Sequence, residues 1–580
     1  MSKIRYLFSL LILLIIFSCG SDSQGEKNEN ILDIALTKEP AGLNPYVIAT
    51  SNAREVYQYI FVPVADFDPV TYELTPILVK EIPKLEPITS GEFEGGYQYT
   101  FEFKDDAVWD DGSPITGEDY VFSVKAVKHP LTSTAGYSGY FQWISDIKID
   151  SLNPRKFSVL FKEHYMLSKE LASTIEVYPR YIYDPSNALT SIRISDLDAG
   201  NIDELISKNE SLKTFAEDFN SIKFSRDNIS NCGPYKLKEW IASQSITLEK
   251  KEDYWGKKYP DIEALHAGAD EIIFHFIADE AAIMSQLKEG NLDVYNEVSA
   301  ESFFDLKTNM TYDEKFQFFT PELMKFYYVA LNNTSPEISD PNVRKALAKL
   351  VDVEQLIKIQ EKGLGRQTVG FINEKKPYYN STLEPIAHDV EGAKEILAEQ
   401  GWEDTNYNGT IDKKVGNQLV EMELDMYITG SDLSKSIALL LKENAKKAGI
   451  TINIIQKQYK DIRDSHLKTG DYDMTILSIN QDLTLDDPYG KWHSENATPG
   501  NRNYYRYISE RSDEIIDSIR STKDDATRNR LYLELQAEMY KDQPVIFLYN
   551  PVEKLIVSDE WKATATMKRP GYMANTFTLK

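Results

Sequence analysis

Oxygen-bearing side chains recur at every second position between Asp404 and Asp412, in the sequence Asp-Thr-Asn-Tyr-Asn-Gly-Thr-Ile-Asp. A calcium-binding loop takes its ligands at such positions, and Gly409 stands where that loop turns sharply. Val415 occupies the position where a bidentate carboxylate completes the site, so that ligand is missing. The stretch therefore predicts a hairpin turn rich in Asp and Asn, with a structural calcium site as the alternative. The ligands of that alternative site would be Asp404, Asn406, Asn408 and Asp412.

Motifs typical of an enzyme's active site are missing from the sequence. Its 7 His residues are scattered, and none belongs to a His-Glu-x-x-His arrangement. The sequence has neither a Gly-x-Ser-x-Gly elbow nor a glycine-rich phosphate loop of the Walker type. We therefore expect a binding protein without a cofactor rather than an enzyme.

The N-terminus has the pattern of a secretory leader. A basic start precedes an apolar run from Leu7 to Phe17, which is shorter than the roughly 20 residues of a membrane-spanning helix. Cys19 follows that run, and the next residues up to Asn30 are polar and have nothing to bury. The pattern predicts a signal peptide over 1–18 and a flexible tether over 19–30. Its resemblance to bacterial lipoprotein signals implies that Cys19 is acylated.

Composition limits the remaining possibilities. Cys232 has no partner once Cys19 is lipidated, so packing rather than disulfides must stabilise the fold. The roughly 550 residues after the tether exceed what a single core supports, which predicts two or three domains. A formal net charge of −27 argues against binding to nucleic acid or to anionic lipid.

The elements that would position a site alternate between strands and helices. Segments 157–161, 245–249 and 271–276 have the pattern of strands, so mixed α/β sheets are expected. Asp340 followed by Pro341 predicts the start of one helix, and Ser431 predicts the start of another, which a glycine ends.

One segment carries a specific pattern. From Ala107 to Ser123 the chain reads Ala-Val-Trp-Asp-Asp-Gly-Ser-Pro-Ile-Thr-Gly-Glu-Asp-Tyr-Val-Phe-Ser. Alternating aromatic residues over 97–103 predict a half-buried strand before it, Asp111-Gly112 predicts a turn, and Thr116 predicts the cap of a helix. This strand, turn and capped helix resemble the signature of the extracellular solute-binding proteins of bacterial ABC peptide importers.

Further segments resemble the same family in order and spacing, so the resemblance covers nearly the whole mature chain. They are Asn231–Trp240, Asp253–Gly256, Leu287–Asp293, Leu331–Asn333, Asp340–Asp352, Tyr472–Met474, Asp487–Pro488, Asn503–Tyr504, Arg528–Tyr532 and Asp542–Pro544.

The resemblance implies an α/β fold with two lobes, namely the type II periplasmic-binding-protein fold in its large three-domain, peptide-binding variety. Its lobes close about a hinge over a ligand cleft. The first lobe would be discontinuous and the second continuous. The implied division is 31–66, 224–279 and 546–580 for the first lobe, 67–223 for an inserted small domain, and 280–545 for the second lobe.

Peptide recognition needs few side chains. Backbone pairing in the manner of a strand provides affinity for any sequence, and a carboxylate at one end binds the N-terminal ammonium. In the family an Asp shortly after the Tyr-Asp segment has this role, and the matching position here is Asp482. The family's Trp is replaced near Ile479, and the spacing up to Pro488 is about two residues longer than in the family. Asp486 or Asp487 is therefore the alternative partner, and a solvated loop acid is the remaining interpretation.

Aromatic residues near the cleft segments are further candidates. Tyr137 matches a family tyrosine that contacts the ligand backbone. Trp143, Tyr489 and Trp492 lie close in sequence to segments expected at the cleft. Packing in a hydrophobic core is the alternative for each of them.

The resemblance finally implies a function. It predicts a monomeric, cofactor-free receptor that captures short peptides and delivers them to an ABC permease and its ATPase subunits. The lipid on Cys19 would hold it on the periplasmic or cell-surface side of a bacterial membrane. The alternatives are a receptor for another solute, such as a sugar or a chelated metal, and a surface lipoprotein that binds glycans.

Overall fold

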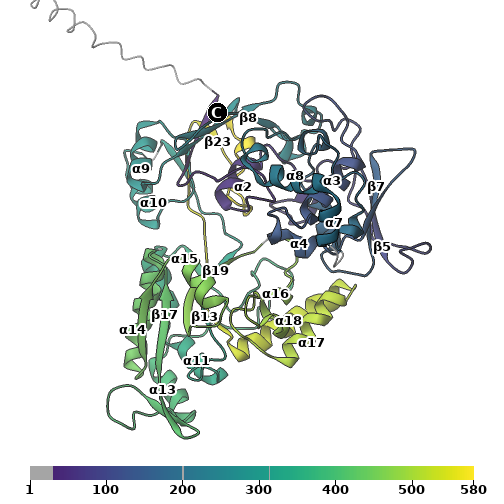
Figure 1. Cartoon of the computed structure of the whole chain (residues 1–580). Helices are drawn as coiled ribbons and strands as arrows, with labels where there is room; N and C mark the ends of the chain where they lie inside the picture. The colour runs from purple at the N-terminus through teal and green to yellow at the C-terminus, as the bar shows by residue number, and fades with distance from the viewer. Residues whose placement is uncertain (1–29, 199–201, 313, 482) are drawn as a thin grey trace, which may run out of the picture.

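The computed structural model describes residues 30–198, 202–312, 314–481 and 483–580. The chain forms an upper and a lower body, and both ends of the described chain belong to the upper one (Figure 1). The predicted signal peptide and Cys19 lie outside the described residues. Among the residues that are described, no helix is both long enough and apolar enough to cross a membrane.

The first lobe is built on a mixed seven-stranded sheet with the order β12-β22-β11-β1-β10-β9-β8. β1 runs parallel to β10 and β11, and the other pairs are antiparallel. The strands are β1 (Ile31–Leu36), β8 (Tyr235–Ile241), β9 (Ser245–Lys250), β10 (Glu271–Phe276), β11 (Val294–Tyr295), β12 (Phe316–Phe319) and β22 (Leu555–Ser558). Its helices are α2 (Ser51–Tyr57), α9 (Glu280–Glu289) and α10 (Ala300–Lys307).

Sheet membership corrects one expected domain border. The expected division places the second lobe from residue 280 onward, but β11 pairs with β1 and β12 pairs with β22. Phe303 of α10 packs with Phe316 and Phe318 of β12 in a small core on this sheet. The first lobe therefore extends to Phe319, because the chain must pair with β22 before it leaves the sheet. The other expected borders stay a prediction.

The inserted domain contains an antiparallel four-stranded sheet with the order β4-β5-β7-β6. Its strands are β4 (Glu86–Pro87), β5 (Tyr97–Glu102), β6 (Asp146–Ile149) and β7 (Lys156–Phe161). Its helices are α3 (Gly117–Lys128), α4 (Ala135–Phe141), α5 (Ser168–Ser173), α6 (Arg180–Tyr183), α7 (Ile202–Lys208) and α8 (Glu210–Asn220). The predicted cap is confirmed, because the Asp119 carboxylate accepts hydrogen bonds from the Thr116 backbone at 3.0 Å and hydroxyl at 3.1 Å.

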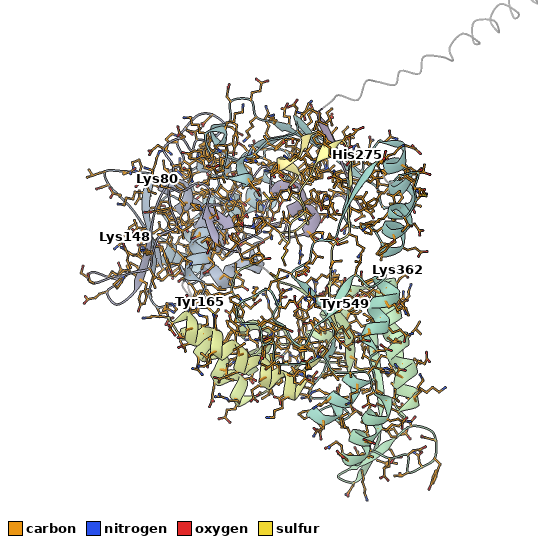
Figure 2. The ribbon with its side chains drawn as sticks, turned by 180° about the vertical axis from the view of Figure 1, so that it is seen from behind. Lys80, Lys148, Tyr165, His275, Lys362 and Tyr549 are labelled. Atoms are coloured by element: carbon orange, nitrogen blue, oxygen red, sulfur yellow. The ribbon has the colours of Figure 1, made fainter. Side chains whose placement is uncertain are left out.

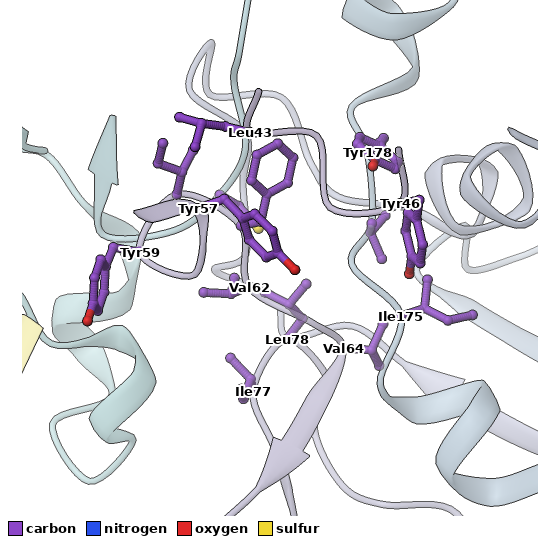
Figure 3. Close-up of a cluster of buried hydrophobic side chains, with 14 of the residues drawn as sticks. Leu43, Tyr46, Tyr57, Tyr59, Val62, Val64, Ile77, Leu78, Ile175 and Tyr178 are labelled. Carbon is purple, nitrogen blue, oxygen red and sulfur yellow. The ribbon is translucent and has the colours of Figure 1, made fainter. Parts of the chain in front are cut away.

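The inserted domain and the first lobe share one hydrophobic core. Figure 3 shows Tyr46 and Val64 of the first lobe beside Ile175 and Tyr178 of the inserted segment. The Val64 amide donates to the Ile175 carbonyl over 2.9 Å, and the Tyr178 hydroxyl donates to Asn44 Oδ1 over 2.6 Å. Because separating them would expose this common core, the two parts form one upper body.

The second lobe has a five-stranded sheet with the order β18-β17-β19-β13-β20. The strands are β13 (Lys325–Leu331), β17 (Glu423–Ile428), β18 (Thr451–Gln456), β19 (Met474–Asn480) and β20 (Val545–Phe547). The helices are α11 (Pro341–Lys349), α12 (Val353–Gln360), α13 (Val390–Glu399), α14 (Asp432–Lys447), α16 (Tyr489–Trp492), α17 (Glu510–Ser521) and α18 (Asp525–Asp542). One buried cluster contains residues of α11–α14 and another contains residues of α17 and α18.

Both helix starts predicted in this lobe are confirmed. The Asp340 side chain accepts from the Asn342 backbone at 2.8 Å, and Ser431 accepts from the Ser434 backbone at 3.2 Å. The second of these helices ends just before Gly449, whose φ of +76° lies in the left-handed region that glycine adopts readily.

Two segments of the chain connect the two bodies, and they run side by side. One crossing joins β12 to β13, and the returning crossing joins β21 (Tyr549–Pro551) to β22. The crossings pair antiparallel at Glu322 and Val552, and the Glu553 amide donates to the Pro321 carbonyl over 2.8 Å. Such a short paired connection is the expected form of a hinge, since few residues must change their dihedral angles.

The remaining strands form small two-stranded units. They are β2 (Ala65–Phe67) with β3 (Leu74–Pro76), β14 (Gly365–Gln367) with β21, β15 (Asp412–Val415) with β16 (Gln418–Glu421), and β23 (Trp561–Lys562) with β24 (Thr578–Leu579).

Candidate ligand site between the lobes

The loop after β19 carries the three acids predicted to bind a ligand ammonium. β19 lies in the middle of the second-lobe sheet and ends at Asn480. Gln481 is buried there, and its amide donates to the Phe371 carbonyl over 2.6 Å. Asp482 is the first predicted partner, and it lies outside the described residues. The structure describes the other two acids, and each of them has partners within the protein.

Asp486 is paired inside the second lobe. Its Oδ2 lies 3.1 Å from the ammonium nitrogen of Lys376 and accepts a 3.0 Å hydrogen bond from the Tyr378 hydroxyl. The Lys376 side chain is 5% exposed, so the pair is largely shielded from water. Burial, together with the Asp486 carboxylate, raises the pKa of Tyr378, which keeps that hydroxyl protonated as a donor. These contacts give Asp486 a structural role, since a lysine already balances its charge.

Asp487 connects the two bodies. Its Oδ2 accepts a 3.2 Å hydrogen bond from the hydroxyl of Tyr165, which belongs to the inserted domain. The same oxygen lies 3.2 Å from Nε of Arg520 on α17. Its Oδ1 accepts from the Tyr489 amide over 3.1 Å, at the start of α16. Burial, and then the Asp487 charge, raise the pKa of Tyr165, so this hydroxyl donates at any physiological pH.

Two of the predicted aromatic residues surround Arg520. Trp143 stacks on Tyr165 with 4.5 Å between the ring centroids and 6° between the ring planes. The Arg520 guanidinium carbon lies 4.1 Å from the ring centroid of Tyr489 and 5.7 Å from that of Trp143. A cation over aromatic faces is attracted by the negative potential of the rings. The structure thus brings Trp143, Tyr489 and Asp487 together, although they come from different bodies.

Tyr137 lies apart from that group, on α4 of the upper body. Its ring contacts the Tyr46 ring edge to face, with 5.1 Å between the centroids. The Tyr46 hydroxyl accepts a 3.0 Å hydrogen bond from the Glu176 amide. Tyr137 is half-buried against the core shared by the first lobe and the inserted domain, so one part of its ring packs and another part is exposed.

Trp492 was predicted to lie at the ligand site, but the structure places it in the core of the second lobe. Its side chain is 2% exposed, and it stacks on Tyr505 with 4.7 Å between ring centroids. Phe371 and Phe547 also contact its ring. Trp492 therefore stabilises the core of the second lobe, because a ring enclosed in this way offers no surface to a ligand.

The stretch from Asp404 to Asp412 forms a turn that leads into the β15–β16 hairpin. Asp404 accepts from the backbone of Asn408 at 3.1 Å and of Gly409 at 3.0 Å. Asp412 accepts from both the amide and the hydroxyl of Thr405. The side-chain oxygens that would bind calcium in the alternative interpretation thus accept hydrogen bonds within the turn itself. Among the described residues, no group of three or more His, Cys, Asp or Glu is placed to hold a metal ion.

Sequence reasoning missed the basic partners of these acids. Lys376 is 110 positions from Asp486 in the sequence, and Arg520 is 33 positions from Asp487. Each lies on another element than its acid, and neither has a local motif around it. Tyr165 was also missed. Only the packing of α17 and of the inserted domain against the loop after β19 brings these groups together.

Two acids of low solvation lie near the hinge, one buried on α2 and one half-buried on the returning crossing. Glu55 on α2 is 5% exposed and accepts a hydrogen bond from the Tyr572 hydroxyl. Burial raises the pKa of Glu55 to about 8, with smaller contributions from the charges of Glu297 and Glu553. Burial also raises the pKa of Glu553, on the returning crossing, to about 7. These carboxyls are held in a region of low solvation, where the neutral form is favoured.

Two lobes joined by a paired crossing are the architecture of a solute-binding protein of the periplasmic type, and not of an enzyme. The sequence pattern of the family described as bacterial extracellular solute-binding proteins, family 5 (middle), matches residues 83–501. The chain belongs to this family. The resemblance seen in the sequence is thereby confirmed.

Relatives and solved structures agree with this assignment. The oligopeptide-binding protein AppA of Bacillus subtilis is 24% identical over 470 residues, which cover 79% of this chain and 76% of that protein. The periplasmic oligopeptide-binding protein OppA of Salmonella typhimurium is 24% identical over 501 residues, 83% of this chain and 82% of that protein. The structure of B. subtilis AppA with a nonapeptide has a TM-score of 0.70, 19% identity, and coverage of 95% of this chain and 99% of that one. NikA from Brucella suis, solved with Fe(III)-EDTA, has a TM-score of 0.72 at 18% identity and covers 95% and 100%.

Proposed function

We propose that this protein is the extracytoplasmic receptor of an ABC importer, that it captures short peptides by closing its lobes, and that it delivers them to a permease with ATPase subunits. It acts as a monomer, anchored to a bacterial membrane through a lipid on Cys19. The observation that carries the proposal is the family match over 83–501, together with a fold shared with an oligopeptide-binding protein that was solved with a nonapeptide.

Within the site, we assign the ligand ammonium to Asp482. Asp486 is neutralised by Lys376, and Asp487 by Arg520. A ligand ammonium at either acid would have to displace a cation that the protein already supplies, which costs free energy. Asp482 follows the last strand residue Asn480 by two positions, where a peptide pairing with the backbone would end.

Calorimetry on the purified protein tests the peptide assignment. Mixed di- to pentapeptides should bind saturably, with micromolar or tighter affinity. Native mass spectrometry of protein purified without added ligand should show peptide masses, because a closed receptor retains its cargo. Saturable binding of oligosaccharides with none of peptides would refute the peptide assignment and leave the fold intact.

A chelated metal is the second candidate ligand. It is favoured by one observation, namely that the same fold in NikA of Brucella suis was solved with Fe(III)-EDTA at a TM-score of 0.72. Titration with Fe(III)-EDTA under the same conditions separates the candidates. Heat of binding from the chelate and none from peptides would favour this second function.

A further inference from the structure

Away from the hinge, the inserted domain packs against the second lobe, and a single cation is the centre of one group of contacts at this boundary, which we call the Arg520 contact. It consists of Trp143 and Tyr165 of the inserted domain with Asp487, Tyr489 and Arg520 of the second lobe. Figure 2 labels Tyr165 where the inserted domain meets the helices of the second lobe, and Tyr549 of the hinge strand at a separate place along the boundary. The two positions therefore constrain the lobes independently.

Arg520 is the centre of this contact. Its guanidinium carbon lies 5.6 Å from the Tyr165 ring and 5.7 Å from the Trp143 ring, both across the boundary. Tyr489 covers another face at 4.1 Å, and the Asp487 carboxylate balances the charge. The Arg520 side chain is 21% exposed and that of Asp487 is 11% exposed. Cation–π and charge-assisted contacts are stronger at such a desolvated place than on an open surface.

Each half of the contact is complete without the other. Arg520, Asp487 and Tyr489 all belong to the second lobe, so their ion pair and ring contact survive when the lobes separate. Trp143 and Tyr165 both belong to the inserted domain, so their stack survives as well. Opening breaks the Tyr165–Asp487 hydrogen bond and the two cation–π contacts that cross the boundary, and it exposes the buried Tyr165 and Met166 side chains, which pack with the second-lobe core. The open form consequently leaves no buried charge unpaired.

We propose that Arg520 determines ligand affinity by holding the lobes closed, without touching the ligand. This inference rests on the proposed function, because it requires a receptor that closes over its cargo. Apparent affinity falls in proportion to the fraction of protein that is binding-competent, here the closed fraction. Contacts that form only in the closed state raise that fraction, and they slow ligand release because the lobes must part first.

The contact has a second point of support nearby. Lys523, in the turn between α17 and α18, contacts the Tyr97 hydroxyl and lies 4.5 Å from the Tyr97 ring centroid. Tyr97 is on β5 of the inserted domain, so this pair also crosses the boundary. The C-terminal end of α17 and the residues after it thus contact the inserted domain at two places. The interface between the lobes therefore does not depend on a single contact.

The test uses Arg520→Gln, which removes the cation at similar size, and Tyr165→Phe, which removes only the hydrogen bond that crosses the boundary. Arg511→Gln is the matched control, because Arg511 lies on the same helix and pairs with Glu514 and Glu534 of its own lobe. Closure is measured by single-molecule energy transfer in the Cys19→Ser full chain. Dyes are attached at Leu152→Cys and Leu439→Cys, whose native side chains are 94% and 61% exposed and belong to different bodies.

Arg520→Gln should weaken binding of mixed di- to pentapeptides by about fivefold to fiftyfold, mainly through faster release, and should lower the closed fraction with and without peptide. Tyr165→Phe should act in the same direction with a smaller effect, and Arg511→Gln should match the wild type. Closed fractions for Arg520→Gln equal to wild type, with or without a loss of affinity, would overturn the inference. If no variant binds peptides, the proposed function fails, while the closed fraction of the unliganded protein still decides whether Arg520 holds the lobes together.

Discussion

The hydroxyl of Tyr165 donates a 3.2 Å hydrogen bond to Asp487, and these residues are 322 positions apart in the chain. One belongs to the inserted domain and the other to the loop after β19 of the second lobe. The bond therefore depends on the relative position of the two bodies, which makes it a reporter of closure. It also gives an acid predicted to bind the ligand a partner within the protein.

Asp482→Ala should weaken peptide binding by roughly tenfold to several hundredfold, because a charge-assisted hydrogen bond contributes about 1.5 to 3 kcal/mol and an abandoned buried charge costs more. Acetylating the peptide N-terminus should cost the wild type a similar factor and the variant much less. Calorimetry on the four combinations is a double-mutant cycle, so it tests the pairing itself. Equal losses on acetylation in wild type and variant would refute the assignment, and the same cycle with Asp486→Asn and Asp487→Asn would show whether another acid has the role.

Cys19→Ser should abolish membrane anchoring, because Cys19 is the only cysteine that directly follows the apolar run, and the other cysteine of the chain, Cys232, is buried in the fold. Cell fractionation followed by immunoblotting should find the protein soluble or as an unprocessed precursor. Mass spectrometry of the wild type should find a lipid-modified N-terminal cysteine. A variant that remains membrane-bound and processed as before would contradict the lipoprotein assignment.

Lys376→Met should destabilise the second lobe, because it leaves Asp486 as an uncompensated charge 16% exposed. Breaking a buried ion pair from one side costs about 3 to 5 kcal/mol. Urea unfolding followed by circular dichroism measures the change in free energy of unfolding. Lys375→Met is the control, since that neighbouring side chain is 41% exposed and lies 3.5 Å from Glu322. Equal stability of the two variants would contradict the structural role of Asp486.

Glu55→Gln should flatten the dependence of stability on pH. The pKa of Glu55 is raised from its ordinary value of 4.5 to about 8 in the folded protein, so between these values the folded state binds more protons than the unfolded state. Stability conferred by this group is therefore present at low pH and is lost as the pH rises toward 8. Glutamine keeps a partner for Tyr572 without a charge, and at pH 9 the variant should be at least about 1 kcal/mol more stable than wild type.

Urea midpoints at pH 5, 7 and 9 check this expectation. Glu301→Gln serves as the control, because Glu301 is an exposed residue on α10. A Glu55→Gln protein with the same change in stability between pH 5 and pH 9 as wild type would show that Glu55 is not buried as a neutral acid.

Local interactions could be predicted from the sequence, because they involve residues a few positions apart. Asp340 and Ser431 cap their helices as expected, and the Thr116 segment forms its capping box with Asp119. The order of the family segments also indicated the fold. None of these inferences required knowledge of which distant segments pack together.

The pairing of strands was harder to predict from the sequence. β11 has only the residues Val294 and Tyr295, a length that carries no periodic signal, and its place beside β1 moves a lobe border from residue 280 to Phe319. A strand that short is defined by the neighbour with which it exchanges hydrogen bonds. Its existence is therefore a property of the assembled sheet.

The candidate site shows the same difference between what the sequence determines and what the tertiary structure decides. The sequence by itself determined that acids and aromatic residues gather around positions 482 to 492, and that the chain belongs among solute-binding proteins. Only the tertiary structure decided that Asp486 pairs with Lys376, that Asp487 joins Arg520 and Tyr165, and that Trp492 is enclosed in a core. The physical reason is that a carboxylate has the same chemistry in an ion pair, an interlobe contact or a ligand site. Its role depends on which charges and how much water surround it, and distant segments of the chain supply both.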